Sequence, residues 1–80
     1  METRAAVIAI IVENRESAEK INTLLHDYAD HIIGRMGLPY HPKNISIISI
    51  VIDAPHDVIS ALSGKIGRLN GVSVKAVYSK

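Results

Sequence analysis

Three consecutive polar residues, Glu13, Asn14 and Arg15, have the residue types best suited to ligand binding in this sequence. They follow a run of Val and Ile and precede an amphipathic stretch, so we expect them to join a strand to a helix. Backbone N–H groups at a helix N-terminus attract anions, and an arginine can bind a carboxylate through two parallel hydrogen bonds. The pattern predicts an effector-binding site at these three residues. It is also typical of an ordinary helix-capping turn with solvated charges.

Metal binding would depend on the histidines, because the sequence contains no cysteine. A zinc site needs three or four ligands that converge on one ion. The histidines show no H-x-x-H or H-x-x-x-H spacing, so no metal site is predicted within one chain. A site assembled between subunits remains an alternative. The histidines are His26, His31, His41 and His56.

Groups for catalysis are equally sparse. Nucleophilic cysteine is absent, and no serine lies in a G-x-S-x-G sequence. Ser63, Gly64 and Lys65 match the end of a phosphate-binding loop, but the earlier glycine of that motif is missing. We therefore predict no catalytic residues and no enzyme activity, and the sequence identifies no cofactor.

The spacing of apolar residues predicts the elements that would position the Arg15 turn. Runs of Val and Ile indicate strands, apolar residues at every third or fourth position indicate helices, and a Gly–Pro-rich segment indicates a loop. Pro55 suits the first position of the second helix, and Gly67 or Gly71 suits its end. The predicted order is strand 4–13, helix 15–30, strand 31–36, loop 37–44, strand 45–53, helix from residue 55, and strand 72–78.

This order of elements is that of the ferredoxin-like βαββαβ fold of the α+β class. It predicts a four-stranded antiparallel sheet in the order fourth, first, third, second strand, with two helices on one face. Residues 5–12 and 45–52 are apolar at both odd and even positions, which indicates strands that are buried on both sides. Because two helices cover only one face, we expect a homo-oligomer, a dimer or tetramer, to cover the open face.

Composition limits the class of protein. Eighty residues suffice for one domain spanning residues 1–80, and the 48% hydrophobic content is typical of a folded chain. The formal net charge of +1 gives no basic patch for nucleic acid. The longest apolar run is far shorter than the roughly 18 residues of a membrane span, and no signal peptide is evident. We expect a cytoplasmic protein without nucleic-acid or membrane binding.

Residues 61–75, together with Leu24, Leu25 and His26, resemble small proteins of the iron-only hydrogenase system regulator family. The resemblance extends from the first strand to Tyr78 and is most specific at the junction of the second helix with the last strand. It implies a fold like that of ACT domains and of the C-terminal domain of nickel-responsive regulators. It also implies effector binding and assembly into dimers or tetramers.

The sequence departs from both relatives at their binding positions. ACT domains that bind amino acids generally have a glycine in the first strand–helix turn, but residues 13–16 contain none. Nickel-responsive regulators use histidines and one cysteine, and at the corresponding positions we expect Leu38, Tyr40 and Ser46 in this chain. We therefore predict a non-enzymatic regulatory module that responds to a small effector or a protein partner. The alternatives are an interaction scaffold that docks through an edge strand, or a histidine-based metal-binding protein.

Overall fold

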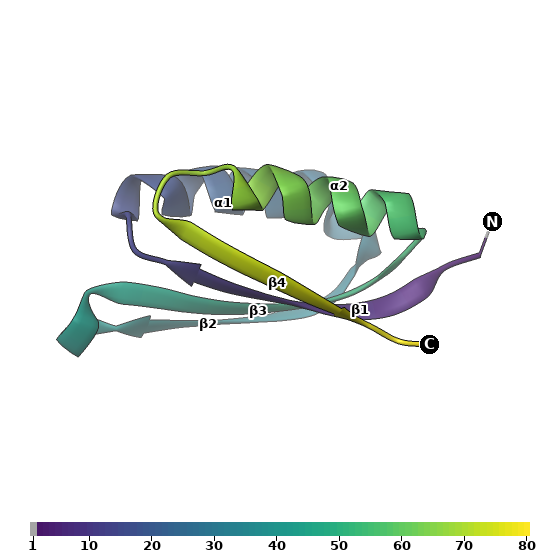
Figure 1. Cartoon of the computed structure of the whole chain (residues 1–80), viewed down its shortest axis with the longest axis horizontal. Helices are drawn as coiled ribbons and strands as arrows, with labels where there is room; N and C mark the ends of the chain where they lie inside the picture. The colour runs from purple at the N-terminus through teal and green to yellow at the C-terminus, as the bar shows by residue number, and fades with distance from the viewer. Residues whose placement is uncertain (1) are drawn as a thin grey trace.

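The computed structural model describes residues 2–80. Among these residues, four strands and two α-helices follow one another in the predicted order (Figure 1). The 3₁₀-helices η1 (Ala29–His31) and η2 (His41–Lys43) flank β2. The principal elements are β1 (Arg4–Val12), α1 (Arg15–Asp27), β2 (Ile32–Tyr40), β3 (Ile45–Ala54), α2 (His56–Gly67) and β4 (Val72–Tyr78).

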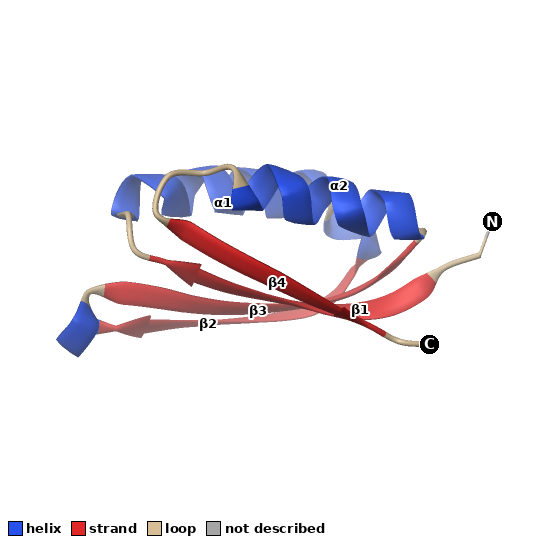
Figure 2. Cartoon of the chain, viewed as in Figure 1, coloured by secondary structure: helices blue, strands red, loops and turns tan. Residues whose placement is uncertain are grey.

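The strands form one antiparallel sheet in the order β2-β3-β1-β4. Both helices lie on the same face of this sheet, and the opposite face is bare (Figure 2). The predicted ferredoxin-like α+β fold, with its strand order and its one-sided helical layer, is confirmed.

The hydrophobic core lies between the helices and the sheet. Even-numbered residues of β1 and β3 point toward the helices, so Ile8 and Ile50 lie opposite each other and are fully buried. The apolar stripes of the helices complete this layer, with Ile21 on α1 and Ile59 on α2. The stripe spacing predicted from the sequence therefore identifies the buried side of both helices.

Odd-numbered residues of the central strands point to the bare side. Directly opposite residues of antiparallel strands share a face, so the register extends this surface across all four strands. We call it the open face. It is apolar in its centre, and charged side chains, Asp53 and Lys75, lie at the end of β3 and on the edge strand β4. Its large apolar residues are Val7, Ile11, Met36, Leu38, Tyr40, Ile47, Val51 and Val77, each at least 38% exposed.

The prediction of a loop over residues 37–44 was partly wrong, because β2 continues to Tyr40. Pro39 cannot donate a backbone hydrogen bond, which usually excludes proline from a central strand. β2 is an edge strand, and Pro39 lies opposite Ser46 of β3. No strand of the described chain lies on the outer side of β2, so a missing N–H on that side leaves no carbonyl of a neighbouring strand without its hydrogen bond. The remaining turn is short and ends at Asn44, whose φ of 54° is left-handed.

Helix boundaries also differ slightly from the prediction. α1 ends at Asp27, and the next residues form η1 rather than a further α-helical turn to residue 30. Pro55 lies at the N-cap of α2 instead of its first helical position. Gly67 ends α2, while Gly71 adopts a positive φ in the following turn. These differences leave the topology unchanged.

Candidate functional site

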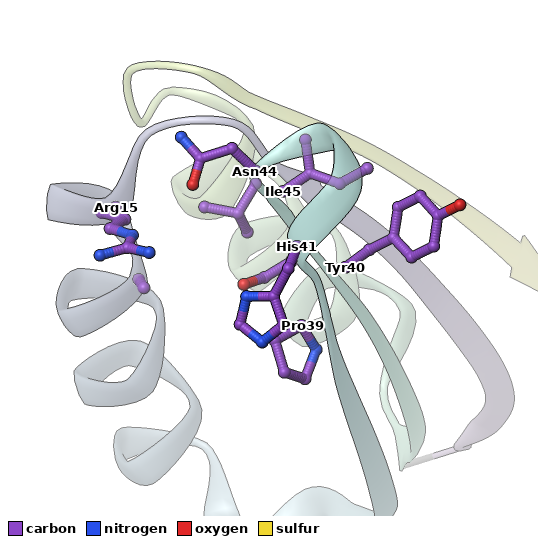
Figure 3. A pocket seen from close by; sticks show the side chains of 9 residues that line it. Arg15, Pro39, Tyr40, His41, Asn44 and Ile45 are labelled. Atoms are coloured by element: carbon purple, nitrogen blue, oxygen red, sulfur yellow. The ribbon is translucent and has the colours of Figure 1, made fainter.

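A pocket of about 130 Å³ lies between the N-terminus of α1 and the tip of the β2–β3 hairpin (Figure 3). The register explains why these segments meet, because Val12 at the end of β1 pairs with Ser46 at the start of β3. In the view of Figure 3, Arg15 lies at the helix on one side and His41 lies at the hairpin on the other side. The lining residues are Val12, Arg15, Ala18, Pro39, Tyr40, His41, Asn44, Ile45 and Ser46.

The charged residues that line this pocket are of one sign, positive. Arg15 contributes a permanent cation and His41 an imidazole, and no acidic residue is among the described residues that line it. Asn44 adds an amide that can donate hydrogen bonds. Cationic and amide donors around an otherwise small apolar space are suited to a compact anion.

Asn14 caps α1. Its side-chain oxygen accepts a hydrogen bond from the Glu16 N–H at 3.0 Å, and its carbonyl accepts one from the Ser17 N–H at 3.0 Å. These contacts are those of an N-cap in extended conformation, with φ −114° and ψ 115°. Asn14 therefore sets the direction in which α1 leaves β1, and with it the position of Arg15 in the first turn.

The turn that carries Arg15 is held against the α2–β4 connection. The Glu13 N–H donates to the Gly71 carbonyl at 2.7 Å, and the hydroxyl of buried Ser17 donates to the Asn70 carbonyl at 2.6 Å. Gly71 has a φ of +70°. A Cβ at this position would lie 2.7 Å from the Cβ of Asn14, so only glycine allows the two segments to approach this closely.

We predict that Gly71→Ala lowers the free energy of unfolding by about 1–3 kcal/mol, because it combines a left-handed backbone with a steric clash against the turn. Urea denaturation followed by circular dichroism measures the change. Gly64→Ala is the matched control. Gly64 lies inside α2, and the nearest contact to its added Cβ is 4.0 Å away, so this variant should gain up to about 1 kcal/mol. Equal effects of the two variants would contradict the proposed role of Gly71.

Of the three residues predicted for an effector site, only Arg15 lines the pocket. Asn14 is engaged as the helix cap, and Glu13 contributes a backbone N–H to the turn while its side chain is exposed. Sequence reasoning missed His41 and Asn44 as neighbours of Arg15. The predicted topology contained the signal, because it places the β2–β3 hairpin beside the end of β1.

Within residues 2–80, no three His, Cys, Asp or Glu side chains gather closely enough to hold a metal ion. His56 instead stacks on Tyr78, with ring centroids 4.9 Å apart. No helix in the described part of the chain is long and apolar enough to cross a membrane.

Comparison with solved structures relates this fold to known proteins. An uncharacterized protein, TM1266 from Thermotoga maritima, is 38% identical, with a TM-score of 0.94 over 99% of this chain and 100% of its own. A protein of unknown function from Galdieria sulphuraria is 9% identical, with a TM-score of 0.73 over 99% of this chain and 46% of its own. The C-terminal domain of the Mycobacterium tuberculosis MgtC protein is 12% identical, with a TM-score of 0.70 over 95% of this chain and 87% of its own.

The two distant structures share the fold alone, whereas the Thermotoga protein is similar in sequence along the whole chain. No protein with a curated description matches this sequence. A family profile matches residues 4–76, which include every strand and helix except the end of β4. The chain therefore belongs to the TM1266-like family, whose description reads "Iron-only hydrogenase system regulator, putative".

Proposed function

We propose that this protein is a non-enzymatic regulatory module that assembles through its open face and responds to a small anion in the Arg15 pocket. The observation that carries the proposal is that the β2–β3 hairpin contributes both to the Arg15 pocket and to the open face. Tyr40 and Ile45 line the pocket and occupy the strand ends that border the open face. In Figure 3 the Tyr40 side chain points away from Arg15, toward that other side of the sheet.

The pocket supplies the groups that an anion requires. The Arg15 guanidinium has a planar arrangement of donors that matches a carboxylate or phosphate. The N-terminal end of α1 adds the partial positive charge of the helix dipole, which favours negative charge in the first turn. His41 and Asn44 approach from the hairpin, so a bound anion would join the helix to the hairpin tip.

Assembly would cover the open face. Exposed apolar patches of this kind usually mark interaction sites, and a second copy offers a surface of the same shape and polarity. Two such faces can pack as a β-sandwich with sheets about 10 Å apart. A shallow hollow of about 270 Å³, lined by Val7, Val51 and Val77 among others, offers room for side chains of a partner sheet.

Coupling between the two features follows from the short η2 turn. A ligand can shift an equilibrium only if it binds one state better than the other. An anion held between α1 and η2 would favour the hairpin position seen here, and so the placement of Tyr40 on the open face. The effector would thereby bias the oligomer or the surface that it presents to a partner. The family description supports a regulatory role in the iron-only hydrogenase system.

Titration of the ¹⁵N-labelled protein with inorganic phosphate tests the pocket. We expect amide shifts in the first turn of α1 and in η2. Arg15→Gln should weaken binding about tenfold or more, because a charge-assisted hydrogen bond contributes about 1.5–3 kcal/mol. Arg68→Gln removes the same charge outside the pocket and should leave the affinity unchanged.

Two results would overturn the anion pocket. One is the absence of phosphate shifts in both segments. The other is an equal loss of affinity in Arg15→Gln and Arg68→Gln, which would indicate that only overall charge matters. An oligomer that binds no anion would favour the scaffold function instead.

A further inference from the structure

The Arg15 pocket is one end of a longer groove. A second hollow, of about 220 Å³, adjoins it and shares Ala18, Pro39 and Ser46 with it. A third, of about 490 Å³, shares Asn22 and Arg35 with the second. The first two lie between α1 and the strands β2 and β3, and the third lies between α1 and β2. We call this surface the α1–β2 groove.

The groove has apolar walls, two arginines and one histidine. Ala18, Ile48, Leu25 and Ile32 line it between the polar groups. Arg15 lies at one end, Arg35 lies further along, and His26 lies beyond Arg35. Among the described residues that line the three hollows, none is acidic. The positive charge of the groove therefore comes from Arg15 and Arg35, which lie at separate points along it.

Arg35 is oriented toward the groove. It pairs opposite Ile50, whose side chain points to the helices, so Arg35 projects from β2 on the same side. Its Nη2 donates a hydrogen bond to the Asn22 Oδ1 at 3.0 Å. A guanidinium carries five N–H donors, so this contact leaves most of them free for a ligand. Asn22 thus holds the arginine over the groove without neutralising its charge.

The two arginines are separated along the groove. Two turns of α1 lie between Arg15 and Asn22, the residue that holds Arg35, which corresponds to about 10 Å along the helix axis. This spacing between the two attachment points along α1 exceeds the size of a single phosphate or carboxylate group. A ligand with an acidic group at each end and an apolar middle would match both arginines and the wall between them.

We infer that the α1–β2 groove binds an elongated dianion of the dicarboxylate type, with one acidic group at Arg15 and the other at Arg35. This inference rests on the proposed effector pocket and names the class of ligand that it takes. The first carboxylate occupies the pocket beside His41, the carbon chain lies along Ala18 and Ile48, and the second carboxylate displaces solvent at Arg35.

Suberate and malonate test the inference, since both are dianionic dicarboxylates and differ in length. Titrations of the ¹⁵N-labelled chain should show suberate binding about tenfold more tightly than malonate. Suberate shifts should extend from the first turn of α1 to Asn22 and Arg35, whereas malonate shifts should stay near Arg15 and His41. Arg35→Gln should remove the advantage of suberate and leave malonate binding intact, while Arg15→Gln should weaken both.

Two further variants make the result specific. Asn22→Asp places a carboxylate beside Arg35 and should abolish the suberate advantage without removing an arginine. Arg68→Gln, outside the groove, should change neither affinity. Retained dispersion of the amide spectrum shows that each variant is folded.

The outcomes separate this inference from the proposed function. Equal affinity for the two dicarboxylates, with shifts confined to the Arg15 end, would refute the elongated ligand and leave the anion pocket standing. If neither dicarboxylate nor inorganic phosphate shifts any of these amides, the pocket itself is refuted, and the groove with it. A suberate advantage that survives in Arg35→Gln would also overturn the assignment of the second acidic group.

Discussion

Replacing Ile47 by glutamate is expected to convert the proposed oligomer to monomers. Ile47 lies on the open face in the central strand β3, where it pairs with Ile11 on β1 and Leu38 on β2. In a two-fold symmetric interface one substitution introduces two carboxylates. An unpaired charge buried in an apolar interface costs about 3–5 kcal/mol, so the dissociation constant should rise at least about a hundredfold.

Sedimentation velocity over a range of protein concentrations measures this change directly. Ala61→Glu adds the same charge to an exposed position on α2, on the opposite side of the molecule, and should leave the oligomer intact. If Ile47→Glu sediments as the wild-type species does, the open face is not the interface. A wild-type protein that is monomeric at every concentration would contradict the proposed assembly altogether.

Much of the fold could be predicted because its determinants are local and repetitive. The apolar stripe of α1 and the mixed apolar run of β3 specify a helix and a two-sided strand without reference to other segments. Exposed Ile47 and Val51 follow the same logic. They are apolar, yet no helix covers them and both are exposed in the single chain. Apolar side chains that stay exposed in one chain are the physical reason to expect a partner.

The boundaries that were missed depend on tertiary context. Pro39 and Gly37 indicate a loop when considered locally, but an edge position allows both to remain in β2. The stretch after Asp27 continues the apolar spacing of α1, yet the backbone tightens into η1 before β2 begins. The end of α1 and the length of β2 depend on where the chain must turn to pair its strands. The secondary-structure propensities of single residues do not specify these positions.

In the candidate site, too, some residues could be identified from local sequence and others depend on tertiary contacts. Arg15 could be identified because it follows a strand and begins a helix, which is a local feature. His41 and Asn44 join it because the β2–β3 hairpin carries its tip beyond the end of β1, a placement that the predicted topology contained but that no local pattern in residues 41–44 indicates. Asn22 and Arg35 are related by a hydrogen bond between two elements, and neither residue has a sequence signal of its own.

Truncating Ile50 to alanine is expected to be among the most destabilising single changes in the chain. Ile50 is fully buried, lies opposite Ile8, and belongs to the cluster that joins the sheet to both helices. Isoleucine-to-alanine substitutions in such positions cost about 2–5 kcal/mol, because the lost methyl and methylene groups leave a cavity. The free energy of unfolding of a domain of this size is only about 4–12 kcal/mol, so the variant should be partly unfolded near 37 °C.

Ile50→Val is the matched control, because it removes one methylene and should cost only about 0.5–1.5 kcal/mol. Urea denaturation at several protein concentrations measures both variants and separates unfolding from dissociation, since the midpoint of a coupled oligomer depends on concentration. The loss of stability caused by Ile50→Ala should persist in the monomeric Ile47→Glu background, because the two residues lie on opposite faces of β3. A loss that disappears in that background would show that the helical layer is not an independent core and that assembly, rather than packing beneath the helices, stabilises the fold.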